Sequence, residues 1–561
     1  MFTLPASGQT PATQSTSSGT ITGRVVSDTG QPLANARVML RTANSVQQLT
    51  GMLTDRDGKF QITDLEPRPY QLSVYLSAYT PFTSPTNYRA GDSVTVVLTK
   101  GGVITGTVTT QTGEPVVGVR VRVRMIGVDS RPASLYDVYA LERMTDDRGV
   151  YRIYGLRTGT YVVWAGGGGG PGQSGLDPFD DIVPTYSPSS TRDDAAEISV
   201  RAGEEVSNVD IRFRGEPGHT ISGKASLSNN APPSYFTLNL TPAGKNKFEW
   251  STLTVQGPDS QSFAFRGVDD GDYDLTVLSH VADGLGNGVA TKRIKVNGAD
   301  VTGIELVTEP LASVSGRIAL EESNKTECTG KQRPVFSETV VLASQDESQP
   351  SDYPFQFMLK APANVEANGN LSLKNLLPGR YVFVPEFAAK YWYLQSITLP
   401  PAKAARTPAP VDATRSWTTL KSGDRLSGLT ITLAQGAASL SAQIADNHAD
   451  SLFLYLVPAD KEQAEDVLRF FSAAIGADGK VELHNLPPGR YWALVHANTE
   501  SAGATTGKLR LPDQKELRTT LRREAEAAKT AIELKPCQHL TGLSLKSEKR
   551  GDTERSVTPP R

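Results

Sequence analysis

The most informative feature of the sequence is an alternation of apolar and polar residues that stops and restarts at short intervals. In one stretch, Phe60 and Ile62 alternate with polar neighbours, and after a turn Tyr70, Leu72 and Val74 do the same. A period of two is typical of a strand that buries one face. The stretch therefore predicts a β-hairpin with one face in a core and one in water.

The same hairpin pattern occurs five times in the chain. An apolar residue is followed five positions later by a second one, and five positions after that by a tyrosine. The five sets are Phe60, Leu65 and Tyr70; Tyr151, Leu156 and Tyr161; Phe263, Val268 and Tyr273; Leu371, Leu376 and Tyr381; and Val481, Leu486 and Tyr491. Repetition in one register predicts a chain of similar modules.

Further predicted strands flank each hairpin. The preceding strands lie at residues 20–26, 103–109, 220–226, 313–319 and 439–445, and four of the five contain a central glycine. The pattern predicts an all-β fold of five tandem β-sandwiches, each with about seven short strands in two packed sheets. We place module 1 at residues 19–100, module 2 at 101–216, module 3 at 217–310, module 4 at 311–435 and module 5 at 436–546. Residues 1–18 and 547–561 are expected to be disordered.

Short joints and one helix complete the predicted architecture. Because joints such as Thr99 to Gly102 leave little slack, the modules are expected to stack as a semi-rigid rod, on the order of 150 Å long if collinear. A helix is predicted at 513–530, with Leu517, Leu521 and Ala525 along one side, where it would cover an edge or face of module 5. The glycine-rich stretch 165–175 in module 2 predicts a flexible loop, because it lacks the Lys-Ser/Thr of a phosphate-binding loop.

Four short motifs in the first two copies resemble a known family. They read "GRV", "GQPLANARV", "TDRDGKF" and "LEPRPY" in module 1, and "GTV", "GEPVVGVRV", "TDDRGVY" and "LRTGTY" in module 2. These pieces resemble the carboxypeptidase-regulatory-like domain, a transthyretin-like, Ig-like seven-strand sandwich. Copies three to five keep the core hairpin and the outer strands, and two of them keep a "PGRY" turn.

The resemblance implies accessory domains without catalytic residues. Bacterial members, often in tandem, are similar to parts of secreted or envelope proteins, and related sandwiches belong to a carbohydrate-binding-like fold group. Collagen-adhesin B-type domains are similar too, and some of them form a Lys to Asn or Asp isopeptide bond. The corresponding first-strand residues here are Arg24, Thr107, Lys224, Arg317 and Gln443. Only module 3 could supply the lysine, so such a crosslink is not expected.

Composition removes two classes of function. A formal net charge of -3 and a pI near 6.2 give no global field for nucleic acid, so no nucleic-acid partner is expected. No window reaches the roughly 18 apolar residues of a membrane-spanning helix.

The first residues lack the basic and apolar regions of a secretion signal. Either the protein stays inside the cell or a signal was trimmed or lies upstream.

The sequence contains few patterns typical of catalytic or metal-binding residues. The six histidines show no metal-ligand spacing, and no G-x-S-x-G motif is present. Asp55, Asp57, Asp146 and Asp147 could suggest calcium, but they lack the further acids of a calcium loop and are better explained as turn residues. We therefore predict no catalytic residue, metal or cofactor.

The aromatic residues and the cysteines suggest two hypotheses, one about a binding site and one about a disulfide. The chain has five tryptophans, at positions 164, 250, 392, 417 and 492. Trp392, Tyr393 and Trp492 are candidates for stacking on a glycan, and the alternative is that the tryptophans fill cores or joints. Cys328 and Cys537 could form a disulfide that staples module 4 to module 5, which makes sense only in an oxidising compartment.

The sequence thus favours a non-catalytic scaffold or binding protein of the bacterial envelope, monomeric and extracytoplasmic, whose partner would be a polysaccharide or an envelope protein. One alternative is a carbohydrate-binding protein or an accessory of a glycan- or peptide-degrading system. Another is a periplasmic extension of an outer-membrane receptor. The location outside the cytoplasm depends on the resemblance alone.

Overall fold

The regular secondary structure of the described residues is mostly β-strand, as the sequence predicts. The computed structural model describes residues 19–42, 50–66, 68–84, 87–126, 142–167, 178–228, 235–243, 251–256, 261–280, 286–346, 363–401, 410–444, 452–476, 478–497 and 505–546. The predicted lead-in, the predicted tail and most of the glycine-rich stretch lie outside these residues. Within the described residues, no helix is both long and apolar enough to cross a bilayer.

Module 1 shows the basic arrangement of two sheets. Its strands are β1 (Gly19–Ser27), β2 (Arg37–Thr42), β3 (Thr50–Leu53), β4 (Lys59–Leu65), β5 (Tyr70–Tyr75), β6 (Phe82–Thr83) and β7 (Ser93–Leu98). One sheet has the order β4-β1-β7 and the other β3-β2-β5-β6. The first strand pairs antiparallel with β4 and parallel with the last strand, β7. Parallel pairing of the first and last strands recurs in every module.

Modules 2 and 3 vary this arrangement. Module 2 contains β8 (Gly102–Thr109), β9 (Arg120–Ile126), β10 (Glu142–Met144), β11 (Val150–Leu156), β12 (Gly159–Ala165), β13 (Thr185–Tyr186), β14 (Ile198–Val200), β15 (Glu205–Val206) and β16 (Ile211–Arg212). Module 3 contains β17 (His219–Leu227), β18 (Tyr235–Pro242), β19 (Ser251–Gln256), β20 (Ser262–Val268), β21 (Gly271–His280), β22 (Gly286–Val296) and β23 (Val301–Pro310). Pairing of β22 with β23 joins the two sheets of module 3 into one of seven strands.

Modules 4 and 5 carry the short helical segments. Module 4 contains β24 (Ala312–Glu321), η1 (Thr326–Cys328), η2 (Phe336–Glu338), β25 (Val340–Gln345), β26 (Ala363–Asn364), β27 (Asn370–Leu376), β28 (Gly379–Glu386), β29 (Trp392–Leu399), β30 (Val411–Asp412), β31 (Thr418–Leu420) and β32 (Arg425–Gln435). Module 5 contains β33 (Ala438–Ile444), β34 (Leu452–Pro458), η3 (Lys461–Gln463), η4 (Val467–Arg469), β35 (Phe471–Ala474), β36 (Lys480–Leu486), β37 (Gly489–Ala497), α3 (Thr506–Leu509), α4 (Lys515–Ala528), β38 (Ala531–Leu534) and β39 (His539–Leu545). Modules 2 and 4 thus have two strands more than the expected seven.

The predicted helix exists and lies on the outer face of a sheet. Leu521 and Ala525 of α4 are buried, and Leu517 packs beside them against Tyr455 and Leu494 of β34 and β37. The apolar side of the helix therefore covers the face of module 5 that points away from its core.

Each module has its own hydrophobic core. The five largest clusters of buried residues span 21–98, 104–213, 221–306, 312–433 and 438–545, and none draws on two modules. The repeated tyrosine lies in the cluster of its own module in all five cases. Its hydroxyl donates to the carbonyl oxygen four residues earlier: Tyr70 to Glu66 (3.0 Å), Tyr161 to Arg157 (2.9 Å), Tyr273 to Asp269 (2.9 Å), Tyr381 to Leu377 (2.8 Å) and Tyr491 to Pro487 (2.8 Å). The tyrosine thus fixes the turn that precedes its strand.

Removing one of these hydroxyls should destabilise its module. Tyr491→Phe leaves the Pro487 carbonyl without its donor and is expected to cost about 1 to 2 kcal/mol in the free energy of unfolding. Burial raises the pKa of Tyr491 well above its ordinary value. The unfolded chain ionises this tyrosine near pH 10, about its reference value, whereas the native chain does not, so stability falls as the pH rises above that point. Thermal unfolding between neutral and alkaline pH should show a shallower loss for Tyr491→Phe than for the half-buried control Tyr154→Phe.

In modules 3 and 5, one corner of the hairpin contacts the preceding module. The residue before the middle apolar position is left-handed in every copy: Asp64 (φ 60°), Gly155 (φ 81°), Gly267 (φ 64°), Asn375 (φ 60°) and Asn485 (φ 57°). At Gly267, a Cβ would lie 2.4 Å from the carbonyl oxygen of Asp180 in module 2, so only glycine permits this contact. The Asn485 side chain instead donates to the Ala389 and Trp392 carbonyl oxygens of module 4, both at 2.7 Å.

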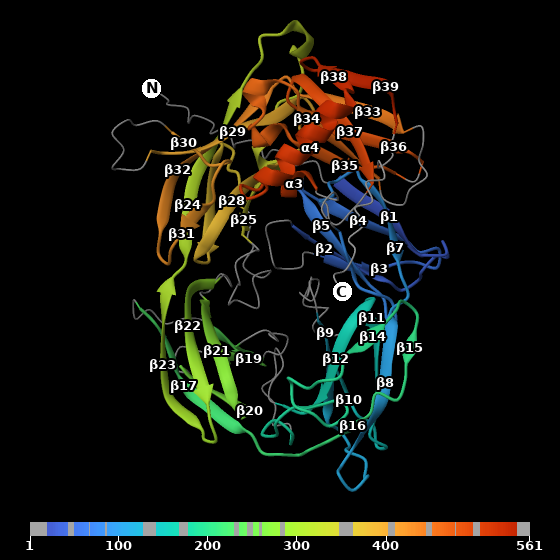
Figure 1. Ribbon diagram of the computed structural model, residues 1–561, viewed down its shortest axis with the longest axis vertical. Coiled ribbons are helices and arrows are strands. Elements are labelled where there is room, and N and C mark those ends of the chain that lie inside the picture. Colours follow the sequence, from blue (N-terminus) through green and yellow to red (C-terminus); the bar gives the residue numbers. More distant parts are fainter. Residues whose placement is uncertain are drawn as a thin grey trace, which may run out of the picture.

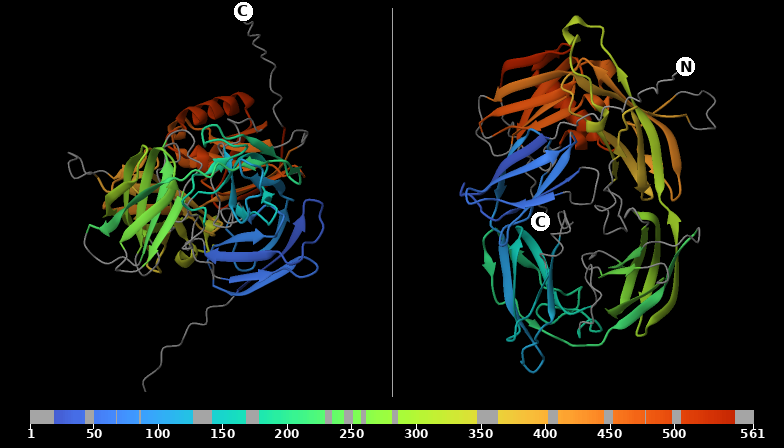
Figure 2. Two further views of the ribbon diagram at one scale, coloured as in Figure 1. Left: turned by 90° about the horizontal axis from the view of Figure 1, so that it is seen from below. Right: turned by 180° about the vertical axis from the view of Figure 1, so that it is seen from behind.

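The modules form a closed ring rather than a rod. Figure 1 shows modules 1 and 2 along one side and modules 3 and 4 along the other, with module 5 beside both module 4 and module 1. The view from behind in Figure 2 shows the same arrangement. The rod prediction is therefore wrong. Short joints restrict the distance between neighbouring modules, but the joint angles depend on contacts such as those of Gly267 and Asn485, which the spacing of motifs does not reveal.

Candidate functional site

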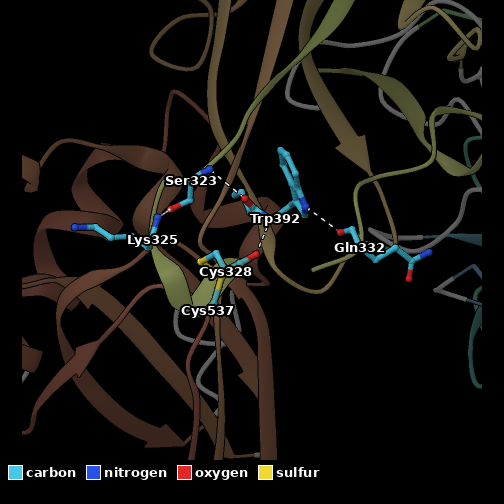
Figure 3. The surroundings of a disulfide bond; sticks show 7 residues. Ser323, Lys325, Cys328, Gln332, Trp392 and Cys537 are labelled. Atoms are coloured by element: carbon cyan, nitrogen blue, oxygen red, sulfur yellow. Dashed lines mark hydrogen bonds between the residues drawn. A yellow bond between two sulfur atoms is a disulfide. The ribbon is translucent and has the colours of Figure 1, made fainter. Parts of the chain in front are cut away.

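A disulfide fastens module 4 to module 5. Cys328 ends η1, in the insertion that follows the first strand of module 4, and Cys537 lies in the turn before β39. The two are bonded across 209 residues of sequence, with Cα atoms 5.5 Å apart (Figure 3). The carbonyl oxygen of Cys328 accepts a hydrogen bond from the Gln435 side chain at 3.1 Å. The crosslink therefore fixes the insertion of module 4 against the end of module 5.

Polar contacts close the ring between module 1 and module 4. The Asn87 side chain donates to Glu386 at 2.6 Å. Arg89 donates to the carbonyl oxygen of Glu338 at 3.3 Å, and its guanidinium lies 3.9 Å from the carboxylate of the same residue. These contacts join residues 299 and 249 positions apart, and all four side chains are only partly buried.

The ring encloses a cleft at the meeting point of modules 1, 4 and 5. Its volume is about 1120 Å³, slightly larger than the usual range for sites that bind small molecules. Asn87 and Arg89 line it from module 1. Module 4 contributes residues 382–386 of β28 and Trp417, and module 5 contributes residues of η4, β36 and α3. No single module could form this cleft.

Charged groups in the cleft differ in whether they are paired. Asp346 is buried and ion-paired with Arg380, whose guanidinium carbon lies 5.6 Å from the centre of the Trp417 ring. Burial lowers the pKa of Arg510 to about 10, so it remains a cation at neutral pH. Arg510 donates to the Leu468 carbonyl oxygen at 3.0 Å and lies over the Phe471 ring. Among the described residues, neither Arg510 nor Lys508 has a carboxylate partner.

The aromatic residues singled out in the sequence lie at three different places. Trp392 has no exposed surface, packs in the module 4 core and donates to the Gln332 carbonyl oxygen at 3.0 Å (Figure 3). A fully enclosed indole offers no face to a sugar, so the stacking hypothesis is wrong for Trp392. Tyr393 is half-buried, and its pKa is raised by burial. Trp492 packs partly beneath α4. Stacking at Tyr393 or Trp492 stays a prediction.

The other candidate residues from the sequence stabilise turns or pack in the interior. Asp55 and Asp146 each accept two backbone N–H bonds within their own turn. No cluster of three or more His, Cys, Asp and Glu side chains that could hold a metal occurs in the described part of the chain. Trp164 is buried and stacks on Tyr186 at 5.5 Å. Trp250 lies outside the described residues.

Sequence reasoning missed the cleft itself. In the sequence, Trp417 is one tryptophan among five, and no motif links it to Arg89 or Arg510. The available signal was weak, because residues in three modules come together only through the angles of the joints.

The fold defines a multi-domain β-sandwich protein, and the comparisons identify part of it. Residues 20–99 match the family model of the carboxypeptidase regulatory-like domain, so the resemblance is confirmed for module 1, which is a domain of this family. No curated protein matches the sequence.

Several solved structures share local similarity. The Bacillus anthracis TIE protein is 11% identical over 80% of this chain and 74% of its own, with a TM-score of 0.15. A streptococcal ancillary pilin is 11% identical over 52% of this chain and 99% of its own, with a TM-score of 0.16. The major pilin subunit BcpA of Bacillus cereus is 10% identical over 52% and 99%, with a TM-score of 0.15. TM-scores this low support no inference about shape or function.

The ring should open when the contacts between modules 1 and 4 are reversed in charge. Arg89→Glu would face Glu338, and like charges repel at this distance. Small-angle X-ray scattering should then show a larger radius of gyration. High salt should act in the same direction on the unaltered chain, because it screens exposed pairs. Arg37→Glu, on an exposed site of module 1, is the control, and equal scattering from both variants would contradict a closed ring held by Arg89.

Proposed function

We propose that the protein is a non-catalytic scaffold of the cell envelope or the secreted space. In this proposal, residues 19–100, 101–216, 217–310, 311–435 and 436–546 are its five domains, which hold a fixed arrangement and present the cleft to a partner. The scaffold works as a monomer and needs no cofactor. The domain family identified in module 1 supports a role without chemistry of its own.

The observation that carries this proposal is the disulfide between Cys328 and Cys537. Disulfides persist in oxidising compartments and are rare in the cytosol. A crosslink between modules, rather than within one core, stabilises their relative placement. That effect suits a protein whose function depends on shape.

The proposal is tested by finding the protein and its thiols in the source cells. Cells are fractionated and treated at once with an alkylating reagent that blocks free thiols. We expect the full chain outside the cytoplasm, with no cysteine alkylated until a reductant is added. Recovery in the cytoplasm with two alkylated cysteines would contradict both the compartment and the role of the crosslink.

The alternative, carbohydrate binding, now depends on fewer residues. With Trp392 enclosed, Tyr393 and Trp492 are the remaining candidates of the original set. Binding to a panel of polysaccharides, compared between the unaltered chain and Trp492→Ala, tests it. No binding to any polysaccharide would remove this alternative.

A further inference from the structure

The strand β28 has an incompletely paired edge. On one side, β25 pairs along the strand, from Gln345 opposite Tyr381 to Val340 opposite Glu386. On the other side, β31 pairs only with Gly379, Arg380 and Tyr381. The outer half of β28 therefore has no neighbouring strand on that side among the described residues.

The pairing pattern shows which backbone groups face this edge. The amide of Asp346 donates to the Arg380 carbonyl oxygen at 2.8 Å, so Arg380 is hydrogen-bonded toward β25. Successive residues of an antiparallel strand alternate in direction. The N–H and C=O of Phe383 therefore point to the unpaired edge, as does the C=O of Pro385. Proline at this place fits an edge, because its missing N–H is the group that would have faced outward.

In every other module, the residue equivalent to Phe383 has a backbone partner. Leu72 donates its N–H to the Ser84 hydroxyl and accepts from the Ser84 amide. The carbonyl of Val163 accepts from the Ser187 amide, and the Ala493 amide donates to the Thr530 carbonyl oxygen. Leu275 lies opposite Lys292 in the pairing of β21 with β22.

Topology explains why module 4 differs. In modules 1 and 2, the strand that follows, β6 or β13, stays in the same sheet and pairs with β5 or β12. In module 4, the following strand β29 joins the opposite sheet and pairs with β32. Because of this crossover, no described strand pairs with the outer half of β28 on that side.

The unpaired edge opens into the cleft. Residues 382–386 of β28 all line it, and Val384 is 38% exposed although it is a large apolar residue. Lys508 and Arg510 line the same cleft from module 5 and have no carboxylate partner in the described residues. The cleft thus offers backbone hydrogen bonds, an apolar surface and, on its module 5 wall, two cations without an ion pair, while Glu386 and Asp513 also line it.

We propose that this cleft binds an extended peptide segment of another protein, which adds to β28 as an edge strand. The backbone of Phe383 supplies the ladder bonds, Val382 and Val384 contact alternate apolar side chains, and Lys508 and Arg510 bind a carboxylate of the peptide. Main-chain bonds supply affinity in this mode, and alternate side chains supply specificity. This proposal does not depend on the cellular location proposed above, because it can be tested with the purified chain.

The probe is a synthetic peptide of about eight residues, a common strand length, with alternating valine and threonine and a free C-terminal carboxylate. Its control has the same sequence with N-methyl groups on alternate amides, which removes the donors that face β28. We expect the control to bind at least about tenfold more weakly in fluorescence anisotropy, equivalent to about 1.4 kcal/mol. Hydrogen exchange should show that the probe peptide protects the Phe383 amide.

Two chain variants locate the binding site. Val384→Lys should weaken binding of the probe peptide by about tenfold, whereas Val411→Lys, on another exposed valine of module 4, should not. Amidation of the peptide terminus should weaken binding to the unaltered chain more than to Arg510→Gln, in which Lys508 alone remains to bind the carboxylate. Equal binding of the methylated peptide, or an unchanged Phe383 amide, would overturn the proposal. So would a Phe383 amide already protected in the free monomer, or dimerisation of the chain that Val384→Lys abolishes, because the edge would then have another occupant.

Discussion

Replacing Gly106 by alanine is expected to destabilise module 2 by about 3 kcal/mol, a large effect for a single residue. Gly106 lies in β8, where this strand runs beside the last strands of the module. A Cβ at this position would lie 2.0 Å from the carbonyl oxygen of Val209 and 2.5 Å from its carbon. Both are backbone atoms, so no side-chain rotation can relieve the overlap. The first and last strands would have to separate.

The same close approach occurs in three other modules. A Cβ would lie 2.3 Å from the Val94 oxygen at Gly23, 2.0 Å from the Ile304 oxygen at Gly223 and 2.1 Å from the Leu429 oxygen at Gly316. This contact explains the central glycine that the sequence pattern shows in four of the five first strands. Module 5 has Ala442 at this place, buried and opposite Leu543.

Differential scanning calorimetry of the full chain tests the prediction. Module 2 should unfold roughly 10 °C lower in Gly106→Ala, because each kcal/mol moves the midpoint of a domain near 100 residues by about 4 °C. The transitions of distant modules should not move. Gly507→Ala is the control, since its nearest neighbouring atom would lie 3.9 Å from the added Cβ. If the unfolding temperature of module 2 did not change, the last strands of the module would move away from β8 at a lower energetic cost than we infer.

The hydrophobic cores could be predicted because each depends on the pattern of residues within short stretches of the sequence. An alternation of apolar residues fixes which side chains of a strand share a face, and Phe60, Ile62, Tyr70, Leu72 and Val74 all lie in one cluster. The tyrosine bond to the fourth preceding carbonyl is equally local. It depends only on the turn between the two strands, which the five copies share.

The ring and the cleft could not be predicted for the opposite reason. Asn87 and Glu386 are 299 positions apart, and their contact depends on the angles of several joints in series. Which of the two candidate roles Trp392 has could not be predicted either, because a period of two separates two faces of a strand without saying which one meets solvent. In β29 one face carries Trp392 into the core, and Tyr393 follows on the other face, half-buried.

Removing the disulfide with the double change Cys328→Ser and Cys537→Ser is expected to lower the unfolding free energy of the linked modules by about 2 to 4 kcal/mol. A crosslink that closes a long loop restricts the unfolded chain most, and this one spans 209 residues. The full entropic value is not expected, because modules 4 and 5 have separate cores. The remaining joint contacts, including the bonds from Asn485 to Ala389 and Trp392, should keep the modules folded and adjacent.

Two measurements separate this loss from a general effect of the substitutions. In calorimetry, a reductant should lower the transitions of modules 4 and 5 in the unaltered chain and leave the double variant unchanged. Limited proteolysis should cut the double variant faster near the joint, while module 3 resists equally in both proteins. If the reductant shifted neither protein, the crosslink would contribute nothing to the joint. The fixed placement of the cleft walls from modules 4 and 5 would then depend on Asn485 and its neighbouring backbone contacts alone.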